Sequence, residues 1–158
     1  MDVWCPIVGG RSHTGGMVGA TPRQRVEAEC VRRGRAAFVA GCVRLLEGDD
    51  SDVRLIQLLG GNTAAWALDP AREPEQHYWF RVWAARGLLW VWQDTAQPAV
   101  RVALRDEAWR VREMAAKVIA RHVVGDLLAD VAPLRDDQVP RVREAATRAV
   151  MRITQANA

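Results

Sequence analysis

Basic side chains recur at intervals of three and four residues in two segments near the C-terminus, and two tryptophans and an arginine occupy the corresponding positions of an earlier segment. A guanidinium can donate forked hydrogen bonds to a carboxylate or a phosphate, and an indole can stack on a ligand or anchor a partner. The spacing predicts one partner-binding surface, called the basic face below. Its members are Trp79, Arg86, Trp90, Arg110, Lys117, Arg121, Arg141, Arg148 and Arg152.

The same spacing also fits a solvated helix surface that binds nothing. Glu113 and Lys117 are four residues apart, as are Glu144 and Arg148, and opposite charges at this separation pair on one helix. Exposed pairs of this kind contribute little to stability and mainly keep a helix soluble. Both interpretations stay open from the sequence.

Aromatic side chains gather at the earliest of the three segments. Six bulky rings fall within residues 78–92, which is more than one buried helical stripe accepts. By helical period Phe80 and Trp83 point inward with one of Trp90 and Trp92, whereas Trp79 lies on the basic face. A core helix that is simply rich in tryptophan is the alternative interpretation.

No residue pattern supports catalysis or a metal site. Cys5, Cys30 and Cys42 form no CxxC pair, and neither they nor the histidines have metal-ligand spacing. The sequence also lacks a nucleophile elbow, a His-Glu-x-x-His motif and a phosphate loop. His122 occupies a place that is apolar in the related segments, which favours a packed side chain. We therefore expect a protein that is not an enzyme and holds no cofactor.

The overall composition predicts one globular domain with a core of its own, because the 158 residues are 49% hydrophobic and 26% charged. No apolar run is long enough to span a bilayer, and the first residues lack the layout of a signal peptide. We therefore expect a cytoplasmic protein with no membrane partner. Positive charge belongs to the second half, since residues 78–158 carry thirteen basic against nine acidic side chains.

The elements that must position these residues are helices. Residues 1–20 contain five glycines and predict a flexible segment, and a single domain is expected over 21–158. Thr21 is expected to be an N-cap with Pro22 at the first helical position. Helical spacing then predicts a long helix over 22–47, bent at Gly34, and a short helix over 52–59. Two breaks within 63–75 leave its form open.

Beyond this point the chain repeats itself at a fixed offset of 31 residues, over about 76–155. The segment 109–121, WRVREMAAKVIAR, aligns with 140–152, PRVREAATRAVMR, and more weakly with 78–90. The segments between them share an apolar i, i+4, i+7 pattern. Each unit predicts a hairpin of two amphipathic helices, which buries its faces only by stacking against its neighbours.

These units resemble HEAT repeats of the short bacterial kind, and the whole chain resembles small actinobacterial HEAT-repeat proteins. That family places an acid in the turn within a repeat and an arginine six residues later. The spacing occurs here three times, as Glu75 with Arg81, Asp106 with Arg112 and Asp137 with Arg143. The acid is expected at the N-cap of the second helix, with the arginine bridging to an acid of its own or an adjacent repeat. The resemblance implies an all-α fold, a right-handed α-solenoid whose second helices line the concave side.

The resemblance implies a scaffold that binds another protein or an acidic peptide on a concave basic face. Nucleic-acid binding is the alternative, because some HEAT-like bacterial proteins, alkylated-base glycosylases among them, cradle DNA in a basic concave face. The net charge of +3 is small for that role, and no aspartate lies beside Trp79 on the predicted face. The sequence leaves the oligomeric state open.

Overall fold

The structure is a computed structural model that describes residues 19–71 and 74–158, apart from the side chains of Pro74 and Glu75. Over these residues the chain is all-α, as predicted, and has no strand. Of the flexible segment expected at 1–20, residues 1–18 lie outside the described residues. The helices are α1 (Pro22–Arg33), α2 (Arg35–Leu46), α3 (Val53–Gly60), α4 (Ala64–Ala67), α5 (Tyr78–Trp90), α6 (Gln97–Ala103), α7 (Trp109–His122), α8 (Leu128–Val131) and α9 (Pro140–Ala156). Short 3-10 turns stand between them: η1 (Gly61–Thr63), η2 (Pro74–His77), η3 (Asp94–Ala96), η4 (Gly125–Leu127) and η5 (Ala132–Asp136).

Thr21 begins the first helix as predicted. The Gln24 amide donates to the Thr21 hydroxyl at 3.2 Å, and the Thr21 amide donates to the Gln24 side chain at 2.9 Å, so two donors at the helix start are satisfied. The single helix predicted over 22–47 is wrong. Gly34 has a φ of 89°, a conformation that glycine adopts without strain, and the chain changes direction there, so that α1 and α2 are separate helices.

Asp52 begins α3 and ties it to α1. One oxygen of its carboxylate accepts from the Leu55 amide at 2.9 Å, and the other accepts from Arg33 at 2.6 Å. The hydrogen bond from Arg33 holds the pKa of Asp52 below its usual value. The short helix predicted over 52–59 is thus confirmed, shifted by one residue.

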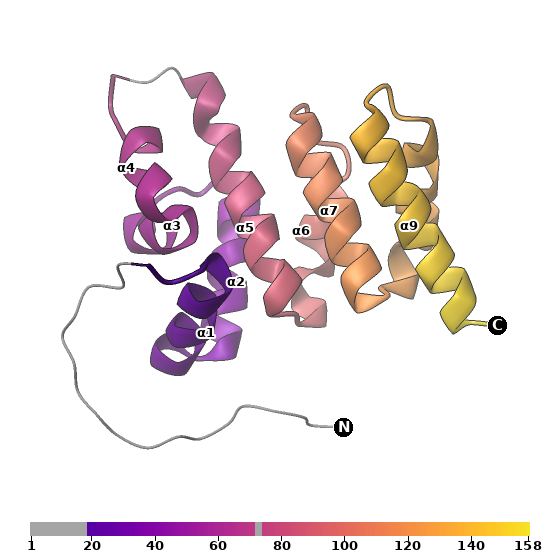
Figure 1. The fold of residues 1–158 in the computed structure, drawn as a ribbon, viewed down its shortest axis with the longest axis horizontal. Coiled ribbons are helices and arrows are strands. Elements are labelled where there is room, and N and C mark those ends of the chain that lie inside the picture. The colour runs from indigo at the N-terminus through magenta and orange to yellow at the C-terminus, as the bar shows by residue number, and fades with distance from the viewer. Residues whose placement is uncertain (1–18, 72–73) are drawn as a thin grey trace.

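Three helices of the C-terminal half, α5, α7 and α9, lie side by side in chain order (Figure 1). Helix α6 packs against α7, and α8 and η5 pack against α9. Positions that are 31 residues apart share their burial, and many carry small side chains that let neighbouring helices approach closely. The buried sets are Phe80, Val111 and Val142; Ala84, Ala115 and Ala146; and Gly87, Val118 and Ala149.

Two ion pairs connect the long helices to one another. One joins α5 to the turn before α7, and the other joins α7 to the turn before α9. Arg81 donates to the Asp106 carboxylate at 2.6 Å, and Arg112 donates to the Asp137 carboxylate at 2.8 Å. Each aspartate also accepts from the backbone amide two residues further on, at 2.9 Å. The hydrogen bond from Arg112 lowers the pKa of Asp137. The carboxylates are therefore bound on both sides, by a neighbouring helix and by their own turn.

These aspartates are not the N-caps that we expected. The cap residues are Ala108 for α7 and Val139 for α9, and neither provides a side-chain cap. An aspartate two residues before the cap reaches the amide of the cap residue itself, so Asp106 and Asp137 close the turn ahead of the helix.

The third expected bridge also differs. Arg143 donates to the backbone carbonyl oxygens of Asp137 and Gln138 at 2.9 and 3.2 Å. Among the described residues it has no hydrogen bond or ion pair to a carboxylate, although its charge helps to lower the pKa of Asp137. In the other two bridges the acid lies 25 residues beyond the arginine. The expected contact of Arg81 with Glu75 involves a side chain outside the description.

The Arg112 bridge should be a major contributor to the stability of this half. Arg112 also donates to the carbonyl oxygens of Asp106 and Glu107, and the Asp137 side chain is only 9% exposed. Arg112→Ala removes the charged partner of Asp137, which keeps the Val139 amide, and the donor to the two carbonyl oxygens. It should lower the free energy of unfolding by about 3 kcal/mol. Urea denaturation followed by circular dichroism measures the change.

The matched control is Arg23→Ala, which breaks an ion pair with Glu27 whose side chains are 63% and 56% exposed. That variant should lose less than about 1 kcal/mol, because water solvates both partners. Equal losses in the two variants would show that the Arg112 bridge is no more than a surface pair.

Candidate functional site

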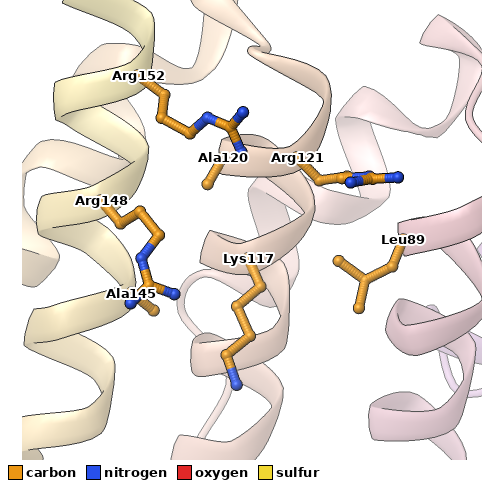
Figure 2. Close-up of a pocket in the computed structure, with 7 residues that line it drawn as sticks. All are labelled: Leu89, Lys117, Ala120, Arg121, Ala145, Arg148 and Arg152. Carbon is orange, nitrogen blue, oxygen red and sulfur yellow. The ribbon is translucent and has the colours of Figure 1, made fainter.

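An open pocket of about 220 Å³ lies on the basic face, between α7, α9 and the end of α5. Figure 2 shows Arg148 and Arg152 extending from α9 toward α7, while Arg121 extends from α7 on the side of Leu89. The lining residues are Leu89, Lys117, Ala120, Arg121, Ala145, Arg148 and Arg152. Because the alanines are short, the pocket has an apolar floor and a cationic rim.

Three of the rim cations, Arg121, Arg148 and Arg152, have no acidic partner among the described residues. The pair expected between Glu144 and Arg148 does not form, and both side chains are exposed. Lys117 behaves as expected and contacts the Glu113 carboxylate at 2.7 Å. Of the four cations that line the pocket, only Lys117 is therefore paired with an acid of its own helix among the described residues.

Glu113 neutralises the part of the basic face next to the pocket. Its side chain is only 8% exposed, and it accepts from Lys117 on the same helix and from Arg141 on α9 at 3.2 Å. A carboxylate this buried is stable only when cations satisfy it. Lys117 and Arg141 are therefore committed to Glu113, unlike the three free guanidiniums of the pocket.

A stack of cations and indoles occupies the other end of the basic face, where α5, α7 and α9 begin. The Arg110 guanidinium lies 4.3 Å from the centre of the Trp109 ring and 5.4 Å from that of Trp79. Arg141 lies 5.6 Å from the Trp109 ring. These distances allow cation–π attraction, so the two arginines are held against indoles. Trp79 itself is half-buried against Tyr78 and Trp83.

Trp109 is the member of this stack that the sequence analysis did not place on the basic face. The 31-residue offset contains the necessary signal, because Trp79, Arg110 and Arg141 are separated by that offset and must lie side by side on neighbouring helices. Trp109 precedes Arg110 at the start of α7 and fits between the neighbouring arginines.

Two predicted members of the basic face are directed elsewhere. Arg86 donates to the carbonyl oxygen of Leu59 at 2.7 Å, at the C-terminal end of α3, where a cation complements the helix dipole. Burial lowers the pKa of Arg86. Trp90 is half-buried and packs against the core. Neither Arg86 nor Trp90 lines the pocket.

The site thus divides into an indole-stacked end and a free cationic end, which can bind an anion. No group of three or more His, Cys, Asp or Glu side chains within the described residues could hold a metal ion. Among the described helices, none is long and apolar enough to cross a membrane.

Comparison with known proteins identifies no relative: no protein-family model, curated protein or solved structure matches the chain.

His122 lies at the end of α7, close to the pocket, and its packed environment is as expected. Its Nε2 lies 2.8 Å from the Leu88 carbonyl oxygen, which can only accept, so Nε2 carries the proton. The ring stacks on Trp92 with 5.2 Å between the ring centres. Burial lowers the pKa of His122, and the charge of Arg121 adds to this effect. The folded protein therefore favours the neutral imidazole.

This preference predicts a loss of stability in mild acid. Because the folded pKa is lower than the unfolded value of about 6.5, the contribution of His122 is complete above that pH and is lost as the pH falls through the folded pKa. The thermal unfolding midpoint should fall between about pH 7.5 and pH 5.5. His122→Gln keeps a donor for Leu88 and removes the titration, so its midpoint should fall less. The same fall in both proteins would contradict the assignment.

Proposed function

We propose that this protein is a non-catalytic interaction scaffold of the cytoplasm that binds an acidic segment of another protein on its basic face. In this proposal residues 76–155 stack as HEAT-like hairpins in a right-handed solenoid, and the outward surface of α5, α7 and α9 is its concave side. The observation that carries the proposal is the open pocket rimmed by Arg121, Arg148 and Arg152, three guanidiniums without acidic partners among the described residues.

The contrast with the rest of the chain supports this interpretation. Elsewhere many arginines are paired with acids, for example Arg33 with Asp52 and Arg101 with Asp130. The pocket is lined by like charges, and an anionic ligand would lower their mutual repulsion. Arginine also loses little hydration on binding a carboxylate compared with lysine. Acidic segments are therefore the partners that this surface fits.

The indole stack favours a protein partner over a nucleic acid. Nucleic-acid binders of this kind use free aromatic faces to stack bases. The Trp109 ring has Arg110 at 4.3 Å and Arg141 at 5.6 Å from its centre. The arginines therefore occupy the surface that a base would need.

The test is a binding titration of the purified protein with a short fluorescein-labelled peptide rich in Asp and Glu, measured by fluorescence anisotropy. Arg152→Glu places an acid in the pocket and should weaken binding about tenfold or more. The control, Arg135→Glu, makes the same change in net charge at an exposed residue of η5 that does not line the pocket. It should bind as the unchanged protein does.

A labelled single-stranded oligonucleotide of similar charge is titrated in parallel. If it binds more tightly than the peptide, with an affinity that falls steeply with salt and depends on Arg152, the basic face is a nucleic-acid interface. Equal effects of the Arg152 and Arg135 variants would also overturn the proposal.

A further inference from the structure

The four cations that line the pocket, called the cluster below, come from two neighbouring helices. Lys117 and Arg121 are one turn apart on α7, and Arg148 and Arg152 are one turn apart on the neighbouring α9, so the rim extends about 6 Å along the helices. Figure 2 shows Arg148 and Arg152 extending from α9 toward α7 beside the two alanines of the floor, while Arg121 extends on the side of Leu89. Four positive charges therefore line one open pocket.

The number of donors exceeds what one carboxylate can use. A carboxylate has a single charge and two oxygens, which two forked guanidiniums saturate. The pocket has three guanidiniums with no acidic partner in the described chain, and a fourth cation, Lys117, on its rim. A phosphate monoester carries about −1.5 to −2 charges and three terminal acceptor oxygens at neutral pH. Its charge and its acceptors match three guanidiniums.

The cluster does not fit a phosphodiester chain equally well. A nucleic-acid strand presents successive single charges and needs cations along a track. Beyond the pocket, toward the start of the helices, Arg141 is bound to Glu113 and Arg110 is stacked between indoles. A bound strand would therefore meet engaged arginines beyond the pocket, where it would need further unpaired cations.

We propose that the pocket between α7 and α9 binds a phosphate monoester, carried by a phosphorylated serine or threonine of the partner protein. The phosphate oxygens accept from Arg148 and Arg152, and from Arg121 once its exposed side chain turns from Leu89 toward the pocket. The side-chain carbons of the phosphorylated residue rest on Ala120 and Ala145. This inference rests on the proposed function and specifies the partner at the same site.

The experiment compares three labelled peptides of one sequence, which carry phosphoserine, glutamate or serine at one central position. The phosphopeptide should bind the full chain at least about tenfold more tightly than the glutamate peptide, because it adds charge and a third acceptor oxygen. Arg148→Lys keeps the charge and removes the fork, so it should reduce this preference for phosphate. Arg135→Lys is the matched control and should keep the preference. Circular dichroism confirms that each variant is folded.

The outcomes separate this inference from the proposed function. If the glutamate peptide binds as tightly as the phosphopeptide and both depend on the pocket, the phosphate assignment is wrong while the scaffold proposal stands. If none of the peptides binds, both are wrong. A 5′-phosphorylated oligonucleotide that binds more tightly than the phosphopeptide would assign the pocket to nucleic acid and overturn the inference.

Discussion

Arg112 connects two turns of the chain through one guanidinium. It donates to the Asp137 carboxylate in the next turn and to the backbone carbonyl oxygens of Asp106 and Glu107 in its own. Asp106 in turn accepts from Arg81 on the preceding helix. Each bridge thus sets where the next long helix begins relative to the helix before it. The alignment of α5, α7 and α9 along their axes depends on these contacts.

The basic face follows from that alignment. When neighbouring helices begin at equivalent points, residues 31 apart lie side by side, as Trp79, Arg110 and Arg141 do. The same alignment places Arg121 of α7 and Arg152 of α9 at the rim of one pocket. A shift of either helix by one turn would separate these residues, so the stability of the bridges and the geometry of the pocket are linked.

Charge balance within the face comes from a single buried acid. Glu113 accepts from Lys117 and Arg141, and the remaining pocket cations have no acidic partner among the described residues. Arg25 of α1 and Arg86 of α5 both donate to carbonyl oxygens at the end of α3. Arg25 thus connects α1 to α3, Arg86 connects the two halves of the chain, and both guanidiniums are engaged within the protein. Arginines of the same type therefore have structural or binding roles according to the acceptors within reach.

The sequence by itself determined the features that depend on local interactions. Thr21 and Asp52 begin helices because their side chains reach amides three residues away. The 31-residue offset identified equivalent positions of α5, α7 and α9, and Phe80, Val111 and Val142 are buried alike. It did not separate α1 from α2, because a glycine can bend a helix or end it, and the choice depends on how α1 and α2 pack on α3 and α5.

The tertiary structure decided which charged side chains are free. Helical spacing placed Arg86, Arg110 and Arg148 on one face, yet Arg86 binds a carbonyl of α3, Arg110 lies against indoles and Arg148 has no acidic partner in the described chain. A long flexible side chain can choose among acceptors on several elements, and those acceptors lie far away in the sequence. Helical period determines the direction in which a residue points, but only the packed helices determine what it meets there.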